Sequence, residues 1–275
     1  MHYIIWLLVA ILYSPILNIL YRSRWDSVDY THAYFILPIS LWLVWRNRAQ
    51  LKEILSKTRK TGSIVGLIIL ILGVLMFILG WKNDYLFIST LSLIPVLCGL
   101  VIFLYGYAIA KTLSFPILYI LLMVPPPLGI LDNLTLPMRY WISVITEHIL
   151  RQFSYPITRD GLLLSMGGYD IYMGPACSGF RSLITMISLG LVYIYIIKAS
   201  IKSKVILLSS LIPLALFGNL IRVISVCLVT FYFGNEIGHK YHDASGFVIF
   251  VIMILGLVGL ENLLQAISSK PHASS

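Results

Sequence analysis

The sequence predicts an all-α polytopic integral membrane protein, and its composition is the first reason. Hydrophobic residues make up 59% of the 275 residues and charged residues only 11%, and the mean hydropathy is +0.92. Soluble domains average about 45–50% apolar and about 25% charged residues, whereas disordered chains are polar and highly charged. The composition therefore excludes both classes and indicates a chain that lies mostly in a lipid bilayer.

Apolar runs along the whole chain are the second reason. A spanning helix needs about 20 predominantly apolar residues, and the chain offers about eight such runs, of which the second and fifth are short. The first run lacks the charged leading segment and the cleavage site of a signal peptide, so we expect it to stay as a span. The eight predicted spans are residues 1–21, 33–45, 62–80, 85–108, 113–124, 180–198, 205–230 and 243–262.

The longest stretch without a span, residues 125–176, is predicted to be an insertion between spans five and six. It opens with three prolines, which cannot continue a helix. Residues 132–153 carry apolar side chains at helical spacing on one face, as does a helix that lies along a membrane surface. Residues 155–173 are predicted to form a short hairpin with Gly167-Gly168 at its turn.

Basic residues predict the orientation, because Lys and Arg next to spans stay in the cytoplasm. Segment 46–60 is rich in them and contains one acid, so we expect it in the cytoplasm, and alternation of the spans then puts both termini there. The insertion 125–176 becomes extracytoplasmic. We expect residues 1–275 to form a single domain in the cell membrane. The net charge of the chain is +9. In a membrane protein, basic residues are explained by their place next to the spans, so we expect no nucleic acid as a partner.

Cys177 is the candidate nucleophile, since it stands where the outer loop becomes the sixth span. A thiol in the first turn of a helix lies at the positive end of the helix dipole, which favours the thiolate. Arg181 follows one turn later on the same face, and a cation there would lower the pKa of the thiol further. The alternative is a structural, buried thiol, which suits Cys98 and Cys227 because they stand within apolar runs.

Two further residues are predicted at the same depth in the membrane. Arg222 stands far along the seventh span, about 27 Å up a core about 30 Å thick. Asn219, one turn earlier, favours a site between helices, and an arginine that snorkels to lipid phosphates is the alternative. His242, near the outer end of the last span, can take and give a proton, with His239 as its rival. A nucleophile, a cation and an acid/base group at one level are what acyl transfer through a thioester requires.

Other chemistries have no support in the sequence. No Cys-x-x-Cys, His-Glu-x-x-His or Gly-x-Ser-x-Gly run is present, which argues against a metal site and against the serine or metallo types of intramembrane protease. The alternative function is a polytopic transporter or lipid-binding membrane protein without peptidase activity. Such a protein would place polar groups along a path across the bilayer, yet the cytoplasmic halves of the last three spans contain almost no polar side chains beyond Ser and Thr.

Three short motifs, in this order, resemble the exosortase/archaeosortase family: Ala176-Cys177-Ser178-Gly179-x-Arg181-Ser182, Asn219-x-x-Arg222-Val223 and His242-x-x-x-Gly246. The early Tyr30-Thr31-His32 stretch and the Val124-Pro125-Pro126-Pro127 corner extend the resemblance over most of the chain. The resemblance implies a membrane-embedded cysteine transpeptidase or protease. It assigns the catalytic roles to Cys177, Arg222 and His242, and we expect supporting or substrate-binding roles for Arg181, Ser178 and Asn219.

The resemblance also implies the partners of the protein. Its substrates would be exported proteins with a C-terminal sorting signal, made of a short motif, a spanning helix and a basic tail. Cleavage would proceed through a thioester on Cys177, which water or an amine on a lipid or glycan acceptor would resolve, and both outcomes remain open. Membrane lipids would surround the enzyme, and no cofactor is implied. Gly174-Pro175 stand where many bacterial members carry an acidic residue, so the recognition motif remains open too.

Overall fold

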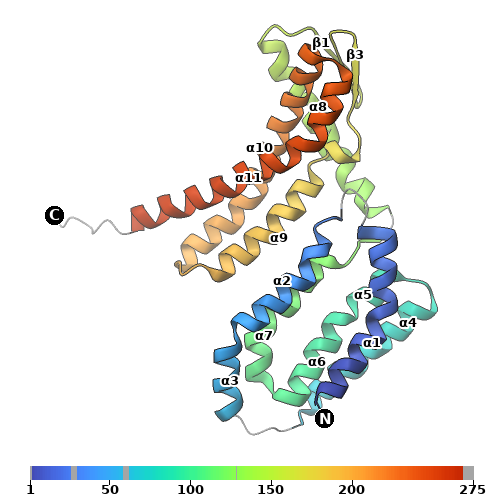
Figure 1. The fold of residues 1–275 in the computed structure, drawn as a ribbon, viewed down its shortest axis with the longest axis vertical. Coiled ribbons are helices and arrows are strands. Elements are labelled where there is room, and N and C mark those ends of the chain that lie inside the picture. The colour runs from blue at the N-terminus through green and yellow to red at the C-terminus, as the bar shows by residue number, and fades with distance from the viewer. Residues whose placement is uncertain (1, 26–29, 58–61, 128, 269–275) are drawn as a thin grey trace, which may run out of the picture. The chain divides into compact units, whose positions relative to one another are not determined.

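The computed structural model of the chain describes residues 2–25, 30–57, 62–127 and 129–268. Residues 58–60 of the predicted cytoplasmic segment lie outside the described residues. The fold is mostly helical, and its internal contacts divide it into two compact units, Met1–Leu128 and Gly129–Ser275 (Figure 1).

Helices long and apolar enough to span a membrane dominate both units. Within the described residues there are five of them: Tyr3–Trp25, Ile64–Lys82, Leu86–Tyr105, Ile201–Phe233 and Ala244–Ile267. Three shorter apolar helices cover Ala33–Arg46, Tyr107–Met123 and Phe180–Ile196. Each of the eight predicted spans overlaps one of these helices, but the number eight stays a prediction because three of them are below the length of a full span.

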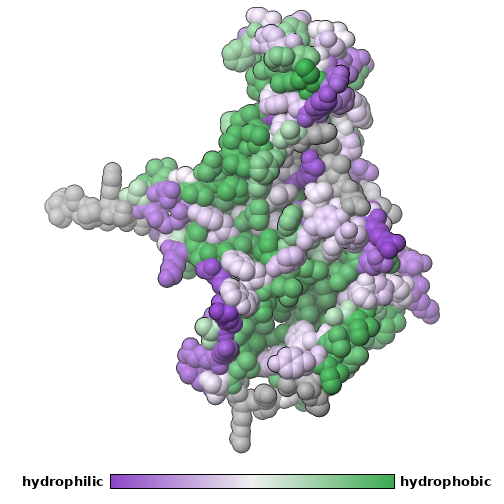
Figure 2. All heavy atoms as spheres, in the orientation of Figure 1, coloured by the Kyte–Doolittle hydropathy of each residue, from purple (hydrophilic) through white to green (hydrophobic). Residues whose placement is uncertain are grey.

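Large apolar side chains cover the outer faces of these helices. Leu72 is 55% exposed, Leu208 46% and Leu255 64%. Figure 2 shows hydrophobic side chains spread over the visible helix faces and hydrophilic ones gathered near helix ends. Soluble monomers rarely expose continuous apolar surface of this extent, and lipid is the solvent that accommodates it. The protein is therefore a multi-pass membrane protein.

The first unit is a helical bundle in which glycines allow close packing. A Cβ atom on Gly66 of α4 (Ile64–Lys82) would collide with the backbone of Phe103 in α6 (Leu93–Tyr105), and one on Gly99 of α6 would collide with the backbone of Leu70 in α4. Small residues at such contacts let helices approach closely within a bilayer. The unit comprises α1 (His2–Leu20), η1 (Tyr21–Trp25), α2 (Ala33–Arg46), α3 (Arg48–Lys57), α4 (Ile64–Lys82), α5 (Leu86–Leu91), α6 (Leu93–Tyr105), α7 (Tyr107–Tyr119) and η2 (Ile120–Met123).

The second unit combines long helices with a small sheet. Helices α9 (Phe180–Ile196), α10 (Ile201–Phe233) and α11 (Asn235–Ser268) lie side by side (Figure 1). Helix α8 (Ile130–Gln152) packs against α10 and the sheet. The elements are α8 (Ile130–Gln152), β1 (Ile157–Asp160), β2 (Leu163–Met166), β3 (Tyr169–Tyr172), η3 (Pro175–Cys177), α9 (Phe180–Ile196), α10 (Ile201–Phe233) and α11 (Asn235–Ser268).

The sheet contains three antiparallel strands in the order β1-β2-β3. Met166 pairs with Tyr169, so Gly167 and Gly168, both at positive φ, form the turn between β2 and β3. The sequence predicts two strands here, whereas β1 adds a third. Leu164 and Met166 are buried in a core shared with α8 and α10, and this core fixes the sheet beside the helices.

Helix α8 buries a mixed face, in which polar side chains lie beside Ile142 and Leu150 of the core. Leu134 and Trp141, on the predicted apolar face, are 55% and 61% exposed. Arg139, Ser143 and Thr146, on the opposite face, are buried. The apolar side chains on the exposed side of α8 suit contact with lipid. The mixed face is thereby available to build the interior of the second unit.

Candidate active site

Cys177 lies in a tight turn at the start of α9. It ends the 3-10 turn η3, and its backbone N–H donates to the Gly174 carbonyl at 2.9 Å. The prediction that Cys177 belongs to the first turn of the spanning helix is wrong by about one turn, because α9 begins at Phe180. Gly179, with φ +76°, separates the two elements. A Cβ atom on Gly179 would lie 2.7 Å from the Asn219 amide, so both the backbone angle and the space require glycine there.

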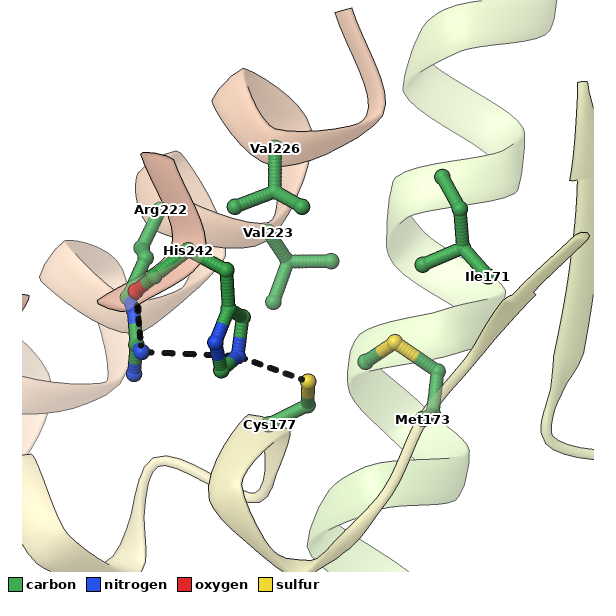
Figure 3. Close-up of a pocket in the computed structure, with 7 residues that line it drawn as sticks. All are labelled: Ile171, Met173, Cys177, Arg222, Val223, Val226 and His242. Atoms are coloured by element: carbon green, nitrogen blue, oxygen red, sulfur yellow. Dashed lines mark hydrogen bonds between the residues drawn. The ribbon is translucent and has the colours of Figure 1, made fainter. Parts of the chain in front are cut away.

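The thiol of Cys177 faces an imidazole and a guanidinium (Figure 3). The Cys177 Sγ atom lies 3.5 Å from His242 Nε2, and Arg222 Nη2 lies 3.4 Å from the same nitrogen. The three residues come from η3, α10 and α11. When His242 Nε2 accepts these contacts, its proton is on Nδ1. His242 can thus receive the thiol proton directly.

Arg222 is enclosed by protein. It is 2% exposed, and its Nη2 donates to the His242 backbone carbonyl at 2.9 Å. Its Nε donates to Ser245 Oγ at 3.3 Å, and Ser245 in turn donates to the same carbonyl at 3.0 Å. The alternative of a snorkelling arginine is therefore wrong. The guanidinium instead ties α10 to the part of α11 that carries the imidazole.

The other motif residues fall into two groups. Asn219 Nδ2 donates to the Cys177 carbonyl at 3.1 Å, and Ser178 Oγ accepts from the Phe180 N–H at 3.1 Å. Both side chains are fully buried and hold the turn around the nucleophile. Arg181 lies beside Arg222 near Gly246, and no described hydrogen bond joins its side chain to Cys177. Arg181 therefore neighbours the cluster without contacting the thiol in this conformation.

Burial raises the pKa of the Cys177 thiol. The positive charge of Arg222, a hydrogen bond with the Gly174 backbone and the charge of Arg139 act in the opposite direction, but burial outweighs them. The expectation of a depressed pKa is therefore wrong, and Arg181 is not among the groups that lower it. A thiol with a raised pKa keeps its proton at rest, so the reaction needs a base beside it.

Arg139 is the residue that sequence reasoning missed. It is 7% exposed, its Nε atom is buried without a hydrogen bond among the described residues, and its charge acts on Cys177. An arginine on the face opposite an apolar stripe is normally expected in water. The sequence contains no signal that Arg139 is buried, because its burial depends on how α8 packs.

Two hollows border the cluster. A small pocket of ≈ 10 Å³ is lined by Cys177, Arg222 and His242 with apolar residues of β3 and α10 (Figure 3). A larger groove of ≈ 390 Å³ also reaches Cys177 and His242, and His239 lines its wall. The imidazole that contacts the thiol is thus that of His242, and its rival His239 lies farther along the groove. In the described ranges, no three His, Cys, Asp or Glu side chains lie together as metal ligands.

The other two cysteines lie elsewhere. Cys227 is fully buried in the core between the sheet and α10, and Cys98 is half-buried in α6 of the first unit. Both fit the structural role expected of them. Cys177 differs from them because a histidine and an arginine surround it.

Fold and site together define a multi-pass membrane protein in which a partly buried cysteine and histidine meet a buried arginine. The chain belongs to the transmembrane exosortase family, whose family model matches residues 25–259. No curated protein and no solved structure matches it significantly. The family generally comprises cysteine-type peptidases or transpeptidases that act on exported proteins with C-terminal sorting signals. Membership suggests a membrane transpeptidase or sorting function.

Proposed function

We propose that this chain is a cysteine peptidase or transpeptidase that cleaves the C-terminal sorting signal of exported proteins through a thioester on Cys177. One observation carries the proposal: Cys177 Sγ lies 3.5 Å from His242 Nε2, which Arg222 also contacts. A nucleophile, a proton acceptor and a fixed cation within contact distance are the parts that acyl transfer needs. Family membership gives the substrate class.

The first half-reaction begins with proton transfer from Cys177 Sγ to His242 Nε2. The sulfur then attacks the scissile carbonyl carbon, a C–S bond forms, and negative charge develops on the carbonyl oxygen. Arg222 supplies the positive charge that stabilises the thiolate and this oxyanion. The C–N bond breaks, the imidazolium returns its proton to the leaving amine, and the exported protein remains as a thioester on Cys177.

The second half-reaction releases the protein. Water, or an amine on a lipid or glycan, gives its proton to His242 and attacks the thioester carbonyl. The C–S bond breaks, and the thiol of Cys177 regains a proton. Hydrolysis yields a free carboxylate and transfer yields an amide, so the mass of the product distinguishes the two.

The membrane arrangement belongs to the same proposal. The substrate's spanning helix would lie beside α9, α10 and α11 with its basic tail in the cytoplasm. Its scissile bond would then meet Cys177 at the extracytoplasmic face of the cell membrane, with both termini of the enzyme in the cytoplasm. We also propose that both units, residues 1–275, work as one functional domain, since the family match covers most of each.

The test uses a tagged exported protein of the same host that ends in a short motif, a single span and a basic tail. Coexpression with the wild-type chain should shorten it, whereas Cys177→Ala should leave it uncut, since loss of a nucleophile costs several powers of ten in rate. Cys227→Ala is the matched control and should retain cleavage. Cleavage by Cys177→Ala would show that Cys177 is not the nucleophile. If the chain were a transporter or lipid-binding protein, neither the wild type nor either of the two variants would cleave the exported protein.

A further inference from the structure

The larger groove follows the edge of β3 to the nucleophile. It borders three consecutive strand residues, Asp170, Ile171 and Tyr172, and it reaches Cys177 and His242. Side chains of consecutive residues point to opposite faces of a sheet. A groove beside three of them in a row therefore runs along the strand edge and not over one face. The opposite wall comes from α10 and α11 through Val226, Thr230, Asn235, Gly238 and His239.

This edge of β3 carries backbone groups that do not pair with β2. Met166 and Tyr169 close a two-residue turn, which makes them a hydrogen-bonded pair. The next residue, Asp170, therefore directs its N–H and C=O away from β2, as does Tyr172. Ser165 Oγ donates to Asp170 Oδ1 at 2.5 Å across this pair, which fits the closer approach of side chains in a non-hydrogen-bonded pair.

The two outward residues differ in what they offer. The Tyr172 carbonyl already accepts from the Gly174 N–H at 2.9 Å. Asp170 offers both a donor and an acceptor, and β3 is the last strand of the sheet on this side among the described residues. At the other edge, α8 packs beside β1, and Arg151 Nε donates to the Ile157 carbonyl at 3.3 Å. Edge strands are commonly covered in this way, whereas β3 faces the groove.

We propose that β3 is the substrate-binding strand: an extended peptide segment of the sorting signal adds to it, pairs with the Asp170 backbone and carries the scissile bond to Cys177. The inference rests on the proposed function, because the occupant is the substrate of that reaction. The groove is continuous with the Cys177–His242 pair, so a peptide that lies in it would reach the two reactive side chains. An extended segment next to a spanning helix also needs partners for its backbone groups near the membrane, and strand addition supplies them from the main chain.

A proline at position 170 tests the backbone contact. Asp170→Pro removes the outward N–H, while the ladder bonds of Tyr169 and Ile171 to β2 remain. Asp170→Ala loses the same carboxylate but keeps the N–H, so the ratio of the two processing rates isolates the hydrogen bond. With the tagged host protein as probe, we expect Asp170→Pro to process about five- to tenfold more slowly than Asp170→Ala. Equal alkylation of Cys177 in both variants shows that the site is intact.

Disulfide cross-linking tests the register and does not depend on the proline variant folding. Tyr172→Cys in a Cys177→Ala background is combined with single cysteines at four consecutive positions before the spanning helix of the probe. Strand addition predicts cross-links at alternate positions, because side chains alternate between faces. Cross-links at all four positions or at none would overturn strand addition.

The outcomes separate the two proposals. If the wild type cleaves the probe and the proline and alanine variants process it equally, strand addition is wrong and the proposed function stands. If the wild type does not cleave the probe, the proposed function fails, and the inference fails with it. A slower proline variant together with alternating cross-links supports both.

Discussion

Replacing Arg222 with lysine keeps the charge beside Cys177 but removes the fork that holds the site. The guanidinium uses Nε for Ser245 and Nη2 for His242, and a lysine with one nitrogen at the end of a flexible stem cannot occupy both positions. Hydrogen bonds to charged groups contribute about 1.5–3 kcal/mol each. A loss of about 3 kcal/mol in transition-state stabilisation corresponds to about a 150-fold fall in rate.

Arg222→Gln separates charge from geometry. The substitution removes a positive charge that partly offsets the rise in the pKa of Cys177 caused by burial. We therefore expect the alkylation profile of the thiol to shift to higher pH in Arg222→Gln and to move little in Arg222→Lys. Processing of the tagged exported protein should fall in both. Arg151→Lys, on the exposed side of α8, is the control and should process normally.

Processing by Arg222→Lys at the wild-type rate would show that the fork is not needed. An unchanged alkylation profile in Arg222→Gln would show that Arg222 does not stabilise the thiolate.

Arg139→Gln should raise the pKa of Cys177, because a positive charge that lowers this pKa is removed. The rate of iodoacetamide alkylation, measured against pH, should then reach half its maximum at a higher pH than in the wild type. An unshifted profile would show that Arg139 does not act on Cys177. Gly179→Ala should lower the free energy of unfolding by at least about 1–2 kcal/mol, because of the left-handed backbone alone, and should lower both Tm and processing. The control Gly174→Ala should be tolerated, because Gly174 has φ −69° and the nearest atom to an added Cβ would be 3.8 Å away. Equal Tm values for the two variants would contradict the role of Gly179. In intact cells, a membrane-impermeant thiol reagent at alkaline pH should label Cys177 and leave Cys227 unlabelled, as measured by mass spectrometry of the peptides. Label on Cys227 alone would reverse the assignment of the reactive thiol.

Helical periodicity and apolar run length predicted most of the fold. The runs 62–80 and 205–230 correspond closely to α4 and to the middle of α10, since a bilayer requires continuous apolar stretches. The sequence does not predict β1 as a strand of its own, because a four-residue strand after a helix has too few residues to display an alternating pattern. The sequence also does not predict the orientation of α8, because periodicity shows which residues share a face but not which face packs inward.

The site was partly predictable for a related reason. Cys177, Arg222 and His242 stand out in the sequence because polar and ionisable residues are rare near spans, and the structure brings their side chains into contact. The pKa shift of Cys177 was predicted with the wrong sign, because the sequence indicates neighbouring charges but not burial. Arg139 was missed because its proximity to Cys177 depends on tertiary packing alone.

A covalent thioester on Cys177 can be detected by intact-protein and peptide mass spectrometry of the wild-type chain, quenched in acid during turnover of the tagged exported protein. We expect an adduct with the mass of the exported protein on the peptide that contains Cys177, and hydroxylamine should remove it. Cleavage of the exported protein with no adduct on Cys177, or with a stable adduct on another residue, would show that Cys177 does not carry the acyl group.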